Sequence, residues 1–171
     1  MGLLSWLFHR TPPIRRSIVD DRQCFDGTFW KLVLPMDWTL KPGSGAALYF
    51  ESADGSKGLY LTVMKLPALG KAEVPGAAKQ LHDMSRRGFE ELKDYQYSVL
   101  EDDLTASESG AVGILDAYDS QKAYRICTKV VVALPYAVRA SFHDYGCDDP
   151  TVSRTYIDSI FQSLEVGRPR A

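Results

Sequence analysis

The stretch from Tyr118 to Asp144 constrains the fold more than any other part of the sequence. Its side chains alternate in character from Tyr124 onward, with the period of two that is typical of a strand. One side carries Tyr124, Ile126, Thr128, Val130 and Val132, and the other carries Arg125, Cys127, Lys129 and Val131. Alternation resumes from Val138 after the break at Leu134-Pro135-Tyr136. The stretch therefore predicts a β-hairpin with one apolar and one polar face.

A turn centred on Pro135 predicts the register of this hairpin. The resulting cross-strand pairs are Lys129 with Ser141, Cys127 with His143, Val130 with Ala140, and Thr128 with Phe142. Upstream, a two-residue loop at Ser120-Gln121 predicts the pairs Asp119 with Lys122, Asp116 with Arg125, Leu115 with Ile126, and Ala117 with Tyr124. Opposite charges then meet across the strands, and apolar residues share one face. We therefore expect a single antiparallel meander.

Length and composition indicate one globular domain. The chain has 171 residues, 45% of them hydrophobic and 25% charged, with a formal net charge of −2. A basic surface for nucleic acid is therefore not expected. Three scattered cysteines do not form a disulfide framework or a CxxC pair, so we expect reduced thiols in a cytoplasmic protein. We assign residues 1–24 to an amino-terminal arm and lead-in, 25–166 to the domain, and 167–171 to a tail.

The arm contains a short apolar run made of Leu3, Leu4, Trp6, Leu7 and Phe8. Basic residues follow this run instead of preceding it, unlike in a secretory signal peptide. The run is also shorter than the roughly 20 residues that cross a bilayer. It is expected either to cap the core of the domain or to make a weak contact with a surface or a partner. The Thr11-Pro12-Pro13 break separates it from the rest of the chain.

Periodicity predicts the remaining elements in chain order. Strands are expected at Phe25 to Leu34, Ala46 to Ser52, Leu59 to Leu66 and Tyr95 to Leu100, with an extended lead-in before the first and an acidic loop from Glu101 to Gly110. A helical stripe covers Ala77 to Leu92 and follows Pro75, which suits a first helical turn. Asp149-Pro150 predicts a capped final helix that ends before Gly167. The order predicts an α+β fold with a mainly antiparallel sheet flanked by helices.

Two motifs resemble the PsbP-like and DcrB-like superfamily. Phe29 to Trp38 is similar to its opening strand, which ends in Leu-Pro and is followed by a tryptophan, and Ile157 to Leu164 is similar to its last helix. The resemblance covers about Phe25 to Val166. It implies an α/β/α sandwich that serves as a non-catalytic binding or accessory module. Some bacterial members, the Eag-type chaperones, hold hydrophobic segments of type VI secretion effectors.

Candidate chemical sites are incomplete in the sequence. His143 and Cys147 have a spacing that suits zinc, but a structural site needs four ligands and a catalytic one three. Cys127 opposite His143 is the alternative of a cysteine hydrolase, although a nucleophile also needs an exposed pocket and an orienting group. No pattern indicates a cofactor. We therefore expect a protein that is not an enzyme.

Surface recognition is the favoured function. Tyrosine, tryptophan and arginine dominate binding hot spots, and Trp38, Tyr49, Tyr60, Tyr118, Tyr136 and Tyr145 are placed at strand ends or loops. We predict that a protein partner docks on the polar face of the meander through Arg125, Lys129, Arg139, His143, Tyr118 and Tyr145. The alternative is that the helix of Ala77 to Leu92 covers this face.

The last helix is expected on the face of Tyr124, Ile126, Val130 and Phe142. The resemblance described above implies that the partner is a secreted effector, with this chain as its accessory, chaperone or immunity protein. A small-molecule or lipid-binding module, with a deep apolar pocket, is the competing class.

Overall fold

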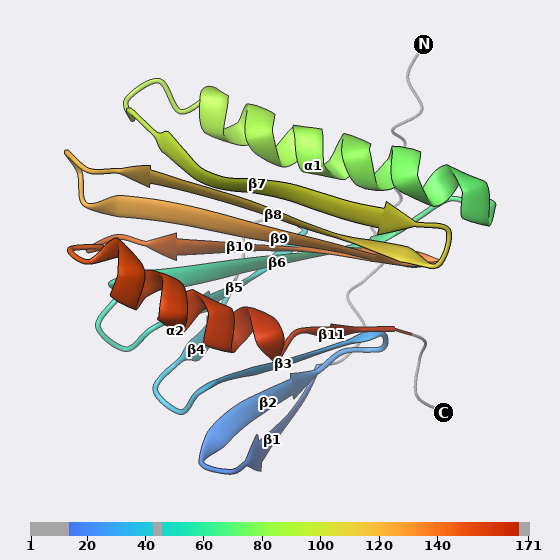
Figure 1. Ribbon diagram of the computed structural model, residues 1–171. Helices are drawn as coiled ribbons and strands as arrows, with labels where there is room; N and C mark the ends of the chain where they lie inside the picture. The colour runs from blue at the N-terminus through green and yellow to red at the C-terminus, as the bar shows by residue number, and fades with distance from the viewer. Residues whose placement is uncertain (1–13, 43–45, 168–171) are drawn as a thin grey trace.

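A computed structural model describes residues 14–42 and 46–167 of the chain (Figure 1). The strands are β1 (Arg15–Val19), β2 (Arg22–Asp26), β3 (Trp30–Pro35), β4 (Thr39–Lys41), β5 (Ala47–Glu51), β6 (Lys57–Lys65), β7 (Ser98–Ser107), β8 (Gly110–Asp119), β9 (Tyr124–Ala133), β10 (Tyr136–Asp144) and β11 (Glu165–Val166). The helices are α1 (Val74–Glu90) and α2 (Pro150–Gln162), and a short 3₁₀ turn at Lys71–Glu73 precedes α1.

The strands form two antiparallel sheets. A seven-stranded sheet has the order β4-β5-β6-β10-β9-β8-β7, and a four-stranded sheet has the order β1-β2-β3-β11. Helix α1 lies on one face of the large sheet, whereas α2 and the small sheet lie on the other (Figure 1). We name these two sides the α1 face and the α2 face. The predicted α+β class, with an antiparallel sheet flanked by helices, is confirmed.

The predicted lead-in is part of the folded sheet. Residues 15–19 and 22–26 form the hairpin β1–β2, and β2 pairs with β3. The strand predicted from Phe25 to Leu34 is therefore two strands, which are separated by a turn at Gly27 whose amide donates to the Trp30 carbonyl. A Cβ atom at Gly27 would lie 2.1 Å from Nε1 of Trp30, so the turn needs glycine. The apolar run of the arm lies outside the described residues.

The predicted acidic loop is a strand. β7 continues to Ser107, with a bulge between Val99 and Glu101. Its acidic side chains point alternately to the two faces of the sheet: Glu101 forms an ion pair with Arg154 of α2, and Asp102 accepts from His82 of α1 at 2.8 Å. Alternating polar partners on both sides hold this edge strand in place, although its sequence has little apolar character.

The two predicted helices are confirmed near their predicted starts. α1 begins at Val74 with Pro75 in its first turn, and the Asp149 side chain caps α2 by accepting from the amides of Thr151 and Val152. α2 ends at Gln162, earlier than predicted, because Ser163 turns the chain toward β3. Its hydroxyl accepts from the amide of Val33 at 3.1 Å, and β11 then pairs with β3.

The register of the β9–β10 hairpin differs from the prediction by one residue. The loop contains only Leu134 and Pro135, so Ala140 pairs with Lys129 and Phe142 pairs with Cys127. A shift of one residue moves every side chain of one strand to the opposite face relative to its neighbour. Arg139 and His143 therefore lie on the α1 face, and Arg125 and Lys129 lie on the α2 face.

The register of β8 and β9 differs by two residues, which preserves the faces. The loop spans residues 120–123, and Asp119 pairs with Tyr124. Asp116 is then a diagonal neighbour of Arg125, and the two still form the predicted ion pair, with 2.6 Å between Nη2 and Oδ2. A shift by an even number of residues keeps every side chain on its predicted face, so Asp116 and Arg125 still form their ion pair.

The core has one part on each face of the large sheet. On the α2 face, Ile157, Ile160 and Phe161 of α2 pack with residues of both sheets, including Cys127, Val138 and Phe142. On the α1 face, α1 packs in two groups that include Val130 and Val132, and Tyr124 and Ile126. The predicted face for α2 is therefore correct for Phe142 and wrong for Tyr124, Ile126 and Val130.

Candidate functional site

The six residues predicted to bind a partner do not share one face. Tyr118, Arg125 and Lys129 lie on the α2 face, and Arg139 and His143 lie on the α1 face. Tyr145 follows β10, and its ring contacts those of His143 and Tyr124 on the α1 face. The prediction of one polar docking face is therefore wrong, and the reason is the one-residue difference in register.

Arg125 is locked under α2. It is 2% exposed and donates hydrogen bonds of 2.9 and 2.6 Å to the carboxylate of Asp116, which is 0% exposed. It also donates to the carbonyl of Pro150 at the start of α2. Burial disfavours the charge of Arg125, but Asp116 offsets this cost and raises the pKa of the guanidinium. Arg154 reaches the same carboxylate from α2 at 3.1 Å.

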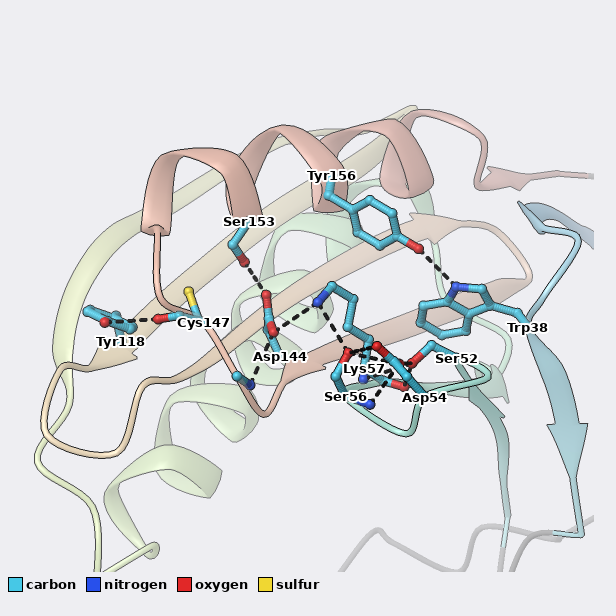
Figure 2. A network of polar contacts seen from close by, with 11 residues as sticks. Trp38, Ser52, Asp54, Ser56, Lys57, Tyr118, Asp144, Cys147, Ser153 and Tyr156 are labelled. Carbon is cyan, nitrogen blue, oxygen red and sulfur yellow. Dashed lines mark hydrogen bonds and ion pairs between the residues drawn. The ribbon is translucent and has the colours of Figure 1, made fainter.

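The polar contacts around Asp144 also join α2 to the sheet (Figure 2). Asp144 accepts from the Ser153 hydroxyl of α2 at 2.7 Å and pairs with Lys57 at 3.3 Å. The Tyr118 hydroxyl donates to the Cys147 carbonyl at 3.1 Å. Further along α2, Lys129 donates to the Phe161 carbonyl at 2.6 Å. Three of the six predicted residues therefore have partners within the chain and hold α2 and the preceding loop on the sheet.

The structure does not form the alternative cysteine hydrolase pair. Cys127 is fully buried on the α2 face, whereas the His143 ring contacts Tyr60 and Tyr124 on the α1 face. Burial raises the pKa of the Cys127 thiol well above its usual range, which disfavours the thiolate. Cys147 lies under α2, away from the ring of His143, and no cluster of three potential metal ligands occurs among residues 14–42 and 46–167.

Half of the α1 face is not covered by α1. The helix packs against β7, β8 and β9, and the sheet continues through β10, β6, β5 and β4 (Figure 1). Aromatic side chains gather at the end of the strands near His143, from Tyr124 of β9, which packs with Phe89 of α1, onto this uncovered half. We name this group the tyrosine patch, and its members are Tyr49, Tyr60, Tyr124, His143 and Tyr145.

The rings of the tyrosine patch form a continuous surface. Tyr49 stacks on Tyr60 with 4.5 Å between ring centroids, and Tyr60 meets His143 edge-on at 5.0 Å. Tyr124 stacks on Tyr145 at 5.5 Å. Tyr60 is 36% exposed and Tyr145 is 43% exposed. Tyr60 and Tyr145 thus present amphipathic rings to solvent, whereas Tyr124 is buried, and exposed tyrosines are typical of a binding surface.

Gly58 lets these rings lie low on the sheet. It pairs with His143 on β10 and with Glu51 on β5. A Cβ atom at Gly58 would lie 2.9 Å from the Tyr49 ring and 3.2 Å from the Tyr145 hydroxyl. Any larger residue would therefore displace the rings above it.

His143 is a neutral member of the patch. Its Nδ1 lies 2.6 Å from the Tyr124 hydroxyl, and its Nε2 lies 3.3 Å from the Ser141 hydroxyl. A neutral ring satisfies both contacts, with one nitrogen accepting and the other donating. Burial and the nearby charge of Arg139 lower the pKa of His143 to about 4.

Arg139 lies beside the patch, and no ion pair of its guanidinium occurs among residues 14–42 and 46–167. It faces Thr62 across β6, and Tyr60 is its diagonal neighbour on the same face. Its Nε is buried and has no hydrogen-bond partner within the described part of the chain. Burial lowers the pKa of this guanidinium, and no carboxylate offsets the cost. Arg139 is thus a cation held at the sheet without compensation.

Sequence reasoning found part of this site. Tyr49, Tyr60 and Tyr145 were expected at the surface, and the structure brings these three together. Trp38 is instead buried and donates to the Tyr156 hydroxyl at 2.9 Å, while Tyr136 stacks on Phe29. Tyr124 and Gly58 were missed. The register of β6 against β10 places Gly58, the registers of β9 with β8 and β10 place Tyr124, and no local signal in the sequence fixes these registers.

The described residues also line a small cavity next to β1, β2 and β4. Its volume is about 240 Å³, and its lining includes Ile14, Gln23, Phe25, Trp38 and Leu40. This volume is below the roughly 300–1,000 Å³ of ligand pockets, so this cavity does not favour a small-molecule site. Within the described ranges, no helix is long and apolar enough to span a membrane.

Comparisons with known proteins establish the fold alone. No family model matches the chain, and no curated protein matches it in sequence. The structure is similar to the solution structure of PsbP from the cyanobacterium Synechocystis sp. PCC 6803, with a TM-score of 0.61 and 10% identity over 90% of this chain and 92% of that one. The predicted PsbP-like fold is therefore confirmed.

Proposed function

We propose that this chain is a non-catalytic binding module that engages another protein through the tyrosine patch and Arg139. The observation that carries the proposal is a continuous, partly exposed aromatic surface beside an unpaired arginine, on the half of the sheet that α1 leaves uncovered. Tyrosine and arginine are the residues that dominate binding hot spots. The Gly58 floor and the strand pairing hold the rings in place before a partner arrives, which lowers the entropic cost of binding.

We further propose an accessory, chaperone or immunity role for a secreted bacterial effector. The resemblance to the superfamily that includes the Eag-type chaperones supports this role by analogy. A cytoplasmic location is part of the proposal, because Cys24, Cys127 and Cys147 are all buried and unpaired, as in proteins of reducing compartments.

Site-specific photo-crosslinking in the native cell tests the proposal. A photoreactive phenylalanine analogue replaces Tyr60 in the patch, and in a matched control it replaces Val152, which is 66% exposed on α2. We expect one discrete covalent adduct with another protein from position 60, which disappears when Tyr145 is also changed to Ala. Equal adducts from both positions, or none from position 60, would contradict the proposed docking surface.

A further inference from the structure

The strongest unexplained feature of the tyrosine patch is the lack of compensation at Arg139. The chain has 22 acidic and 20 basic residues, so carboxylates are in excess. Arg125 and Arg154 both bind carboxylates, and Arg154 contacts Glu101, Asp116 and Asp158. Arg139 has a buried Nε with no acceptor in the described residues. A buried donor without an acceptor destabilises the chain, so a partner that supplies an acceptor is favoured at this position.

The surroundings of Arg139 match a planar acceptor. The guanidinium lies beside α1, because a Cβ atom at Gly88 would be 3.9 Å from Nη2. Thr62 is its cross-strand neighbour on β6, and Tyr60 is the diagonal neighbour on the same face. His143 lies four residues further along the same strand and its pKa is depressed, so the ring adds no second positive charge at neutral pH. The site therefore contains one guanidinium fork beside a helix, on the sheet face that carries the tyrosine patch.

We propose that Arg139 is the receptor for a carboxylate side chain of the protein partner, presented by an acidic segment that lies along the tyrosine patch. This inference rests on the proposed function and names the chemistry of the same site. A carboxylate is planar and accepts two parallel hydrogen bonds from one guanidinium, which suits a single arginine. A phosphate group carries more charge and is usually held by clustered basic residues, whereas Lys41, on the edge strand β4 of this part of the sheet, is paired with Glu51.

Side-chain NMR of arginine tests the proposal directly. Protein with ¹⁵N-labelled arginine is titrated with a blocked hexapeptide of alternating glutamate and leucine, with its glutamine counterpart, and with inorganic phosphate. The Nε–Hε signal of Arg139 is assigned by its loss in Arg139→Gln. We expect the glutamate peptide to shift this signal saturably and to slow rotation of the guanidinium, and we expect the glutamine peptide to bind about tenfold more weakly or worse.

Variants separate the charge of Arg139 from its shape. Arg139→Gln is expected to weaken binding of the glutamate peptide about tenfold, and Arg139→Lys is expected to recover only part of it, because a lysine lacks the fork. Arg15→Gln, on the exposed strand β1, removes the same charge and should leave binding unchanged. Arg139→Lys also serves if Arg139→Gln does not fold.

The remaining outcomes overturn the inference, each in a distinguishable way. Equal affinity for the glutamate and glutamine peptides would show that Arg139 does not select a carboxylate, while the proposed docking surface would stand. Tighter binding of phosphate would assign the arginine to a phosphate ligand. If no probe shifts the Arg139 signal while the crosslink at position 60 persists, the proposed function stands and the carboxylate receptor fails. Loss of the crosslink as well would overturn both.

Discussion

Arg125 and Arg139 lie on neighbouring strands of one hairpin, and their environments are opposite. Arg125 points to the α2 face, where Asp116, the Pro150 carbonyl and the capped start of α2 surround it. Arg139 points to the α1 face at the margin of α1, with a buried Nε that has no described acceptor. Both residues are arginines, and both lie in the large sheet. The arginine of the α2 face thus joins α2 to the sheet, and we propose that the arginine of the α1 face binds an external partner.

This difference shows that the effect of substituting a buried charged residue can be predicted only when the partner of its charge is known. A paired buried ion contributes little net stability, but removing one member leaves the other without compensation. The α2 face should therefore be sensitive to substitution of its polar residues. The uncovered half of the α1 face should tolerate substitution and lose binding instead.

The largest expected loss of stability comes from placing a charge in the apolar core under α2. Ile160→Asp should abolish cooperative folding, because Ile160 is fully buried and an unpaired carboxylate would replace it. The loss should exceed about 4 kcal/mol. Val152→Asp is the matched control on the exposed side of the same helix. Urea unfolding followed by circular dichroism measures both, and a stable Ile160→Asp protein would refute the assigned packing of α2.

The next effect tests the locked arginine. Arg125→Met should lower the free energy of unfolding by about 3 kcal/mol, because Asp116 would keep only Arg154 as an ionic partner in a fully buried position. The measurement is the urea midpoint at neutral pH. A change below about 1 kcal/mol, the range of exposed ion pairs, would show that this pair behaves as one of them.

A third prediction concerns the pH dependence of the α1 face. The pKa of His143 is about 4 when folded and near 6.5 in an unfolded chain. Between these values the unfolded state binds the proton first, so stability falls as the pH drops from about 6.5 to 4, by about 1–3 kcal/mol. The pKa of His82 is also lowered, by burial first, so it acts in the same direction. His143→Gln should flatten this part of the profile, and an unchanged slope would count against a neutral buried ring.

The smallest effect sharpens the comparison most. Arg139→Met should leave the free energy of unfolding unchanged or raise it by up to about 1 kcal/mol, because it removes an unsatisfied donor and breaks no ion pair. Measured beside Arg125→Met under the same conditions, it should differ in sign or be near zero. A loss as large as that of Arg125→Met would mean that Arg139 has a structural role and is not held ready for a partner.

Much of the fold was predictable because its signals are local. Pro75 and the apolar stripe that contains Leu81 and Phe89 predicted α1, and the Asp149-Pro150 pair predicted the start of α2. β7 was missed beyond Leu100 because its residues Glu101 and Asp102 gain partners only from α2 and α1. The strands β1 and β2 were missed because they belong to the small sheet, which pairs segments far apart in the sequence, β1 to β3 with β11.

The sequence by itself determined which side chains of each strand lie together, which residues cap the helices, and that Asp116 would pair with Arg125. Only the tertiary structure decided which faces of neighbouring strands coincide. That choice depends on whether the loop at Leu134-Pro135 holds two residues or three, and the alternation within each strand is the same in both cases. Packing of α1 and α2 against the two faces selects the observed register. This selection separates Arg139 and His143 from Arg125 and Lys129, and it creates the tyrosine patch.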